Sequence, residues 1–321
     1  MTNKVYTPQD ITVYFFAHDR GDFLRQALDC YLNQTVQGAK LVLLANAPSP
    51  DVLQVAKDYA PRGVQLHLEE KPMRVFECTR WCQQIAKSPI TVMAHDDDLI
   101  HPAYLENVLH AYNTIADLAV CCSSMGEFEE TPEYTGLSKA YVLTQPQFSA
   151  YIYQGSSFCF TSCSYKTELL KQAPAPDYDT YGKIFDAPFM LQATGSHLAA
   201  VFDFHFIRYR THNQQDSQTF STGPTAREWL NLEKLHRRLI FSAGSLRLRV
   251  LYAAANWFRL RMGWKDWCLC EHRKMNFSDY LLQAKEAGVY SRLGRFLGIF
   301  LHGKTRRKVT YKLLGITPRK I

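Results

Sequence analysis

The chain has 321 residues, which allows one large domain with an appendage or two modest domains. Its hydrophobic fraction of 46% indicates a globular protein with a substantial core and excludes a disordered chain. No apolar run approaches the roughly 18 residues that a membrane-crossing helix needs, and no apolar stretch follows Lys4. We therefore expect a cytoplasmic protein without a secretory signal, in which the nine cysteines are mostly buried thiols.

The charge is divided unevenly along the chain. Residues 225–321 hold 21 Lys and Arg against 6 Asp and Glu, whereas residues 1–224 hold 16 against 24. A mildly acidic body with a strongly basic tail predicts an anionic partner for the tail. Lipid headgroups and nucleic acid both satisfy this charge, but no nucleic-acid-binding motif accompanies it, so we expect no nucleic acid.

Predicted strands and helices alternate over the first hundred residues. Short β-branched and aromatic runs predict strands at 11–16, 40–44, 64–68 and 90–94. Apolar residues at helical spacing predict helices around 24–32, 52–59 and 75–86. This alternation is typical of a mostly parallel sheet, in which ligands bind beyond the carboxyl ends of the strands.

The pattern is less regular beyond residue 104. We expect a helix there, a strand at 118–124 and several short aromatic-rich strands within 125–185. The residue patterns that follow predict a helix at 185–193 and a strand at 198–209. A polar stretch with Gly and Pro follows at 213–224, so we divide the chain into an α/β unit, 1–217, and a helical basic region, 218–321.

Three consecutive aspartates follow the predicted strand at 90–94. Asp96, Asp97 and Asp98 repel one another unless a cation or solvent offsets their charge. Alternate carboxylates at Asp96 and Asp98 can point toward one site, and such oxygen ligands suit Mg²⁺ or Mn²⁺. The alternative is that Asp98 only caps the helix that begins near Pro102 and that Asp96 and Asp97 are merely solvated.

Four other segments with polar or charged residues lie at the ends of predicted strands or at the start of a predicted helix. The predicted first strand ends in Ala17, His18, Asp19 and Arg20, and the second ends at Asn46. Asp186 begins a predicted helix, and the last predicted strand of the unit leads into Tyr209-Arg210-Thr211-His212. In this order the features resemble the family 2 glycosyltransferases of GT-A fold, from about residue 11 to residue 217.

The resemblance implies a fold and a donor site. The fold is α/β and Rossmann-like, with a mostly parallel sheet, antiparallel strands on the acceptor side and a C-terminal helical region. The implied donor-binding residues lie at the strand ends and beside the diphosphate: Ala17, His18, Asp19, Arg20, Asn46, Arg74, Asp96, Asp97 and Arg210. Asn46 stands where the family has a carboxylate that contacts the base.

The resemblance also implies the catalytic groups. Asp98 and His212 would hold Mn²⁺ or Mg²⁺, and Asp186 would be the base that accepts the proton of the acceptor hydroxyl. The polar stretch 213–224 would close over the donor. The alternatives are that Asp186 only caps its helix and that His212 is an ordinary surface histidine.

The function implied is an inverting, metal-dependent transfer of a hexose or N-acetylhexosamine. The donor would be a nucleotide sugar, with a UDP-sugar favoured, and the acceptor a lipid-linked or surface-polysaccharide glycan. An apolar stripe at 293–301 with basic residues beyond it predicts an amphipathic helix on an anionic membrane surface, unless that helix packs on the catalytic unit. The alternative function is a non-catalytic binding module that recruits partners through its basic tail.

Overall fold

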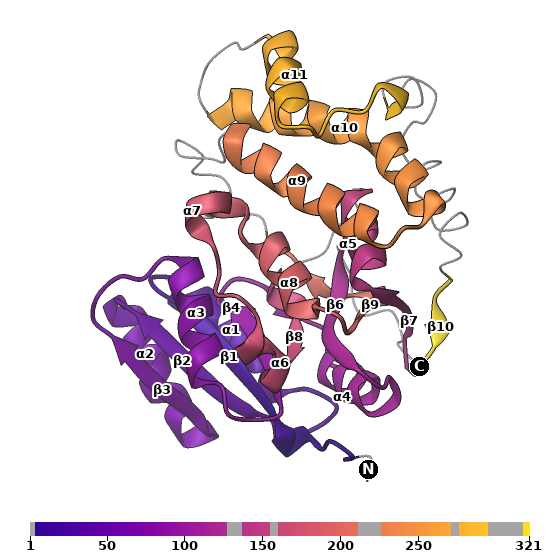
Figure 1. The fold of residues 1–321 in the computed structure, drawn as a ribbon. Helices are drawn as coiled ribbons and strands as arrows, with labels where there is room; N and C mark the ends of the chain where they lie inside the picture. Colours follow the sequence, from indigo (N-terminus) through magenta and orange to yellow (C-terminus); the bar gives the residue numbers. More distant parts are fainter. Residues whose placement is uncertain (1–3, 127–136, 155–159, 211–225, 271–275, 295–316) are drawn as a thin grey trace.

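The computed structural model describes residues 4–126, 137–154, 160–210, 226–270, 276–294 and 317–321. Within these residues one mixed sheet of ten strands runs through the molecule, helices cover both of its faces, and a layer of helices lies beyond one end (Figure 1). The sheet order is β10-β7-β9-β6-β8-β4-β1-β2-β3, and β5 pairs with β9.

The first four long strands form the parallel half of the sheet. They are β1 (Ile11–Ala17), β2 (Lys40–Asn46), β3 (Val64–Glu69) and β4 (Ile90–His95). The helices between them are α1 (Gly21–Leu32), α2 (Pro50–Tyr59) and α3 (Val75–Ile85), with short 3-10 turns at Pro8–Asp10 and Ala60–Arg62. All pairings in the order β3-β2-β1-β4 are parallel, so this part of the sequence prediction is confirmed.

The second half of the sheet is mixed. Its strands are β5 (Leu99–Ile100), β6 (Leu118–Gly126), β7 (Lys139–Thr144), β8 (Ser164–Lys166) and β9 (Leu198–Arg208). Its helices are α4 (Tyr104–Thr114), α5 (Gln145–Tyr153), α6 (Thr167–Gln172), α7 (Tyr178–Tyr181) and α8 (Asp186–Thr194), with 3-10 turns at Phe160–Ser162 and Gly182–Ile184. Because β8 lies antiparallel between β4 and β6, it joins the two halves.

The prediction of aromatic-rich strands is wrong for α5. Pro146 occupies the first turn of this helix, and the Thr144 backbone N–H and side chain both contact the Gln147 side chain in a capping box. These start signals favour a helix, and residues 148–153 of that helix are buried. The period of the apolar residues is hidden because nearly every residue of α5 is buried.

The C-terminal region is helical where the structure describes it, apart from its last residues. Its helices are α9 (Ala226–Ser242), α10 (Leu246–Cys270) and α11 (Phe277–Glu286). No helix in the described part of the chain is both long and apolar enough to cross a membrane. The last strand, β10 (Arg319–Lys320), pairs antiparallel with β7, so the expectation of helix throughout is wrong there. The boundary at residue 217 lies outside the described residues.

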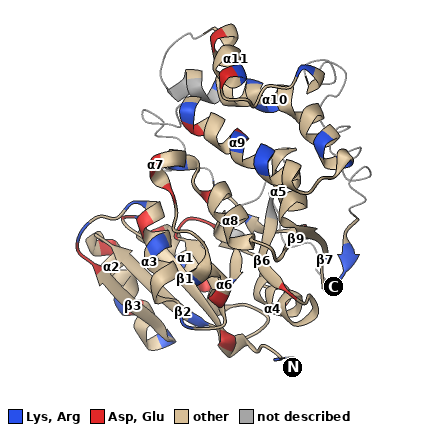
Figure 2. Ribbon diagram, viewed as in Figure 1, with Lys and Arg blue, Asp and Glu red and all other residues tan. Residues whose placement is uncertain are grey.

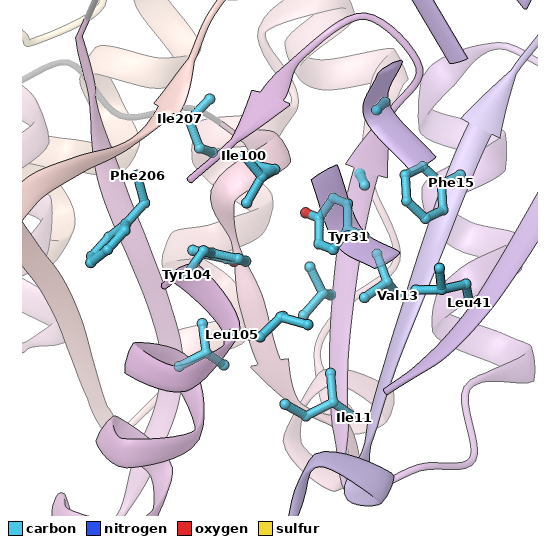
Figure 3. Close-up of a cluster of buried hydrophobic side chains, with 14 of the residues drawn as sticks. Ile11, Val13, Phe15, Tyr31, Leu41, Ile100, Tyr104, Leu105, Phe206 and Ile207 are labelled. Atoms are coloured by element: carbon cyan, nitrogen blue, oxygen red, sulfur yellow. The ribbon is translucent and has the colours of Figure 1, made fainter. Parts of the chain in front are cut away.

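Two apolar clusters fill the two faces of the sheet. The first lies under α1, α2 and α4 and includes Phe15, Tyr31, Leu41 and Tyr104 (Figure 3). The second lies under α3, α5 and α8, and α9 contributes to it with Leu232 and Leu235. The helical region therefore shares a core with the sheet rather than only touching it.

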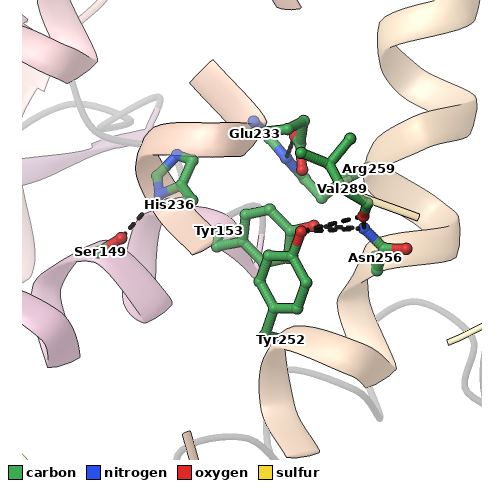
Figure 4. A network of polar contacts seen from close by, with 8 residues as sticks. All are labelled: Ser149, Tyr153, Glu233, His236, Tyr252, Asn256, Arg259 and Val289. Atoms are coloured by element: carbon green, nitrogen blue, oxygen red, sulfur yellow. Dashed lines mark hydrogen bonds and ion pairs between the residues drawn. The ribbon is translucent and has the colours of Figure 1, made fainter. Parts of the chain in front are cut away.

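A buried polar network joins α5 to the C-terminal helices (Figure 4). Asn256 donates from its amide to the Tyr153 hydroxyl at 3.0 Å and to the Val289 carbonyl at 2.8 Å. Arg259 Nε lies 3.3 Å from Glu233 Oε1, where the Glu233 side chain is 2% exposed and that of Arg259 10%. Paired in this way, the buried charges are tolerated, because an uncompensated one would be costly.

Candidate active site

The ends of β1, β2 and β4 lie at one edge of the sheet. In the register of β1 and β4, Phe16 lies beside His95, the last residue of β4. The chain then turns through three aspartates into β5. Asp96, Asp97 and Asp98 are 0%, 7% and 3% exposed, which excludes the alternative that they are simply solvated.

Arg20 forks across two of these carboxylates. Its Nη2 lies 2.5 Å from Asp96 Oδ1, and its Nη1 lies 2.5 Å from Asp97 Oδ2. Arg20 is the residue just before α1, so the first strand–helix connection neutralises part of the acidic run. Burial raises the pKa of Asp96 to about 7, against the lowering effect of Arg20. A guanidinium suits this position because its planar fork can contact two carboxylates at once.

His95, Asp97 and Asp98 form a candidate cation site. Their potential ligand atoms all lie within 4.8 Å of one another. The Nε2 of His95 is buried and has no hydrogen-bond partner among the described residues. Two carboxylates and an imidazole are a donor set that binds divalent metals such as Mn²⁺. The residues present therefore fit a divalent cation.

Asp98 is oriented by two further contacts. Its Oδ2 accepts a hydrogen bond of 2.7 Å from the Thr161 hydroxyl, and its Oδ1 accepts one of 3.2 Å from the Arg210 backbone N–H. Burial, followed by the charge of Asp97, raises the pKa of Asp98, and the hydrogen bond from Thr161 lowers it. A bound cation would favour the ionised form further.

The structure differs from the expected pairing of Asp96 with Asp98. Asp96 faces Arg20, while Asp97 joins Asp98 at the candidate cation site. His95 is a member of this cluster that the sequence analysis missed. The signal was its place next to the acidic run, because the chain bends at Asp96 and Asp97 and so brings His95 beside Asp97 and Asp98.

Asn46 is tied to the chain that follows β3. Its Nδ2 donates to the Met73 carbonyl at 2.7 Å, and its Oδ1 accepts from the Met73 N–H at 2.7 Å. Its own backbone carbonyl lies 2.7 Å from Nδ1 of His18. Both ends of the amide are thus used in holding the segment before α3 against the end of β2. Contact of Asn46 with a base stays a prediction.

The other donor-site candidates surround this edge. Ala17 is the buried last residue of β1, and Asp19 is exposed one residue before Arg20. Arg74 is exposed at the start of α3, with its guanidinium 5.4 Å from the centre of the Tyr178 ring. Arg210 reaches α1, where its guanidinium lies 4.3 Å from the centre of the Phe23 ring. Its Nη2 donates to the Gln26 side chain at 2.9 Å.

Asp186 is the first residue of α8 rather than the residue that caps it. Its Oδ1 accepts a hydrogen bond of 2.8 Å from the Ala187 backbone N–H. Burial raises the pKa of Asp186, while the Ala187 N–H and the nearby His95 lower it. Phe160 contacts both His95 and Phe185, the residue before Asp186, and this places Asp186 near the candidate cation site. His212 and the polar stretch 213–224 lie outside the described residues.

The sequence profile described as Glycosyl transferase family 2 matches residues 12–172. The chain belongs to glycosyltransferase family 2. The matched half of this family 2 glycosyltransferase contains the parallel strands, the three aspartates and Thr161, whereas Asp186 and Arg210 lie beyond it. No curated protein matches the sequence.

Two solved structures are similar in fold to this family 2 glycosyltransferase. TarS residues 1–349 from S. aureus has a TM-score of 0.62 at 13% identity, covering 95% of this chain and 91% of that chain. The same protein in complex with UDP-GlcNAc also has a TM-score of 0.62 at 13% identity, covering 95% and 92%. At this identity the likeness shows the fold alone, and it confirms the predicted GT-A architecture.

Proposed function

We propose that the protein transfers a hexose or N-acetylhexosamine from a nucleotide sugar to a glycan acceptor, with inversion at the anomeric carbon. The observation that carries this proposal is the cluster of His95, Asp97 and Asp98 at the carboxyl ends of the parallel strands. A UDP-sugar is the favoured donor, because a TarS structure of similar fold holds UDP-GlcNAc. Membership of family 2 supports transfer of a sugar as the reaction.

The donor end of the reaction depends on a fixed acidic run. Breaking the sugar–phosphate bond leaves negative charge on a nucleoside diphosphate, and a divalent cation supplies the Lewis acid that stabilises it. Asp97 and Asp98 would hold that cation together with His95. Arg20 fixes Asp97 and Thr161 fixes Asp98, so both carboxylates are held in place before the donor binds.

The acceptor end of the reaction depends on Asp186. A carboxylate that accepts the proton of the acceptor hydroxyl works best when its pKa approaches the working pH. Burial at the start of α8 raises the pKa of Asp186 in this direction. The hydroxyl oxygen attacks the anomeric carbon as its proton moves to Asp186, and the sugar–phosphate bond breaks on the opposite side.

A lipid-linked acceptor on an anionic membrane is supported by the surface of the helical region. Lys and Arg lie along α9 and α10 (Figure 2). Arg247 and Arg249 are exposed in the first turn of α10, next to Leu246, which is 75% exposed, and Val250, which is 39% exposed. Basic and apolar side chains exposed together suit a headgroup layer. The predicted amphipathic segment beyond Leu293 falls largely on residues 295–316, outside the described residues.

Donor turnover with a panel of sugars tests the proposal. UDP-, GDP- and dTDP-sugars are incubated with the protein and Mn²⁺, with and without glycan acceptors, and nucleotide release is measured. We expect release that requires the cation, and we expect Asp98→Asn to abolish it while Asp179→Asn, a change on the exposed side of α7, leaves it intact. Full activity in Asp98→Asn would refute the site, and absence of turnover with every donor would favour the non-catalytic binding module.

A further inference from the structure

The imidazole of His95 lies beside aromatic rings and also beside the carboxylates of the candidate cation site. Its ring lies between Phe16 and Phe160, with centroid distances of 6.1 and 6.2 Å. Neither phenyl ring offers the imidazole a conventional hydrogen bond. Nε2 of His95 is buried and unpartnered among the described residues, although the ring contributes a nitrogen to the cluster with Asp97 and Asp98.

An unsatisfied ring nitrogen in this position is unfavourable. A buried polar group without a partner is destabilising, and each such group in a folded protein calls for an explanation, such as a catalytic role or an unseen ion. An imidazole nitrogen offers a lone pair that a metal can use. A cation held between His95, Asp97 and Asp98 would engage that lone pair and offset the repulsion of the two carboxylates together.

The ligand type bears on which cation the site prefers. Mg²⁺ is small, requires oxygen ligands in a nearly ideal octahedron and usually keeps several waters. First-row transition ions accept imidazole nitrogen readily. A site of two carboxylates and one imidazole therefore favours Mn²⁺ over Mg²⁺, whereas a site built from carboxylates alone would accept both.

We propose that His95 is a direct ligand of the cation and makes this site selective for Mn²⁺ over Mg²⁺. The proposal rests on the proposed function, in that the same cation serves the donor diphosphate. His95 is then a metal ligand rather than a residue that only packs under the acidic run. It adds a nitrogen to a site whose other described ligands are oxygens.

Pulsed electron paramagnetic resonance on the Mn²⁺-loaded full chain with UDP reads the ligand directly. A coordinated histidine gives a ¹⁴N hyperfine coupling on Mn²⁺, which should change to a ¹⁵N coupling when the protein is labelled with ¹⁵N-histidine. We expect the coupling in the wild type and its loss in His95→Asp. It should persist in His67→Gln, a matched control that removes an exposed histidine from β3. Bound Mn²⁺ without nitrogen coupling would overturn the proposal.

His212 must be separated from His95 in this experiment, because the sequence resemblance implies it as a ligand. The His212→Ala variant is measured beside His95→Asp. A coupling that survives His95→Asp but disappears in His212→Ala would assign the nitrogen to the other histidine and overturn the proposal. A coupling reduced in both variants would keep His95 as one of two ligands.

Competition between the ions tests selectivity. Mg²⁺ is titrated against bound Mn²⁺, and the displaced Mn²⁺ is followed by its room-temperature resonance signal. Since losing even an indirect partner of a metal ligand costs about 10–100-fold in affinity, we expect the Mn²⁺-to-Mg²⁺ affinity ratio to fall about tenfold or more in His95→Asp. An unchanged ratio would contradict the proposal. Circular dichroism of the metal-free variants verifies that each is folded.

Failure of the inference and failure of the proposed function give different results. Sugar transfer with no nitrogen coupling and no preference for Mn²⁺ would remove His95 from the ligand set and leave the glycosyltransferase intact. Nitrogen coupling that depends on His95, without turnover of any donor, would keep the metal site and reject the transferase.

Discussion

The Thr161 hydroxyl donates a hydrogen bond of 2.7 Å to Oδ2 of Asp98, across 63 positions of sequence. Thr161 lies in the 3-10 turn Phe160–Ser162, just before the antiparallel strand β8. The carboxylate after β4 is thus oriented by the segment that joins the two halves of the sheet. Both partners are buried, at 2% and 3% exposed, so water cannot replace this contact easily.

We expect Thr161→Val to weaken cation binding about 10–100-fold. A hydrogen bond to a charged group contributes about 1.5–3 kcal/mol, and valine has the shape of threonine without the donor. Calorimetric titration with Mn²⁺ in the presence of UDP measures the effect. Thr161→Ser keeps the hydroxyl and should bind within a few-fold of the wild type, and equal affinity in the valine and serine variants would contradict the prediction.

Asp186→Asn should lower kcat about 10²–10⁴-fold while leaving Mn²⁺ binding unchanged. The amide cannot accept the acceptor proton, and general-base catalysis contributes about that factor. Steady-state transfer with a fixed donor gives kcat, and the calorimetric titration gives the cation affinity. Asp279→Asn, an exposed change in α11, serves as the control. A normal kcat in Asp186→Asn would reduce Asp186 to a structural residue.

Asn46→Asp should destabilise the fold and raise the KM for the donor more than it lowers kcat. Aspartate keeps the acceptor for the Met73 N–H but places a carboxylate oxygen beside the Met73 carbonyl, at a residue that is 9% exposed. The lost bond and the repulsion should lower the free energy of unfolding by about 1–3 kcal/mol. Denaturant unfolding and donor kinetics measure the two effects.

A matched control exists for this amide. Asn113 contacts both backbone polar groups of Tyr6 in the same way, with distances of 2.9 and 2.7 Å, but at an exposed position. Asn113→Asp should destabilise the protein less and leave the donor KM unchanged. If both substitutions shift KM equally, the segment before α3 does not act on the donor.

The buried histidine His236 should make stability fall in mild acid. Burial, followed by the charge of Arg259, holds the pKa of His236 well below its usual value of 6.5. Below pH 6.5 the unfolded chain takes up a proton that the folded protein does not, so the free energy of unfolding decreases as pH falls. The slope for this group approaches about 1.4 kcal/mol per pH unit.

Comparison with His236→Asn isolates this contribution. Asparagine can keep a contact with Ser149, whose hydroxyl lies 2.9 Å from Nδ1 of His236, and does not titrate. The difference in unfolding free energy between wild type and variant should therefore shrink between pH 7.5 and pH 5.5. Because Glu233 is present in both proteins, its raised pKa, which acts in the opposite direction, largely cancels in the difference. A difference independent of pH would contradict the prediction.

The strands and helices of the parallel half of the sheet can be predicted from the sequence, because the strands are apolar runs and the helices have apolar residues at helical spacing. The same reasoning locates the three aspartates at a strand end and Asp186 at a helix start. The sequence pattern does not show which way each aspartate faces, because Asp96 is oriented by Arg20, which lies 76 positions earlier in the chain. Local patterns carry no information on such a contact.

Three other features, α5, β10 and the role of His95, could not be predicted from the sequence for related reasons. In α5 almost every residue is buried, so no helical stripe is visible and the aromatic residues suggest strands. β10 consists of two exposed basic residues, and only its pairing with β7 makes it a strand. His95 escapes prediction because the bend after β4, which no local pattern indicates, brings it beside Asp97 and Asp98.

The shared core of α9 limits how this enzyme can be recombined. Leu232 and Leu235 belong to the same apolar cluster as residues of α5 and α8. Gly182, with a φ of 53°, lies so close to Glu228 that any Cβ there would overlap the carboxylate. A chimera joined between β9 and α9 would take its sheet from one protein and α9 from another. The apolar residues of α9 would then pack against α5 and α8 residues that they do not fit. Exchange of the helical region between relatives must therefore carry α5 and the Gly182 turn along with it.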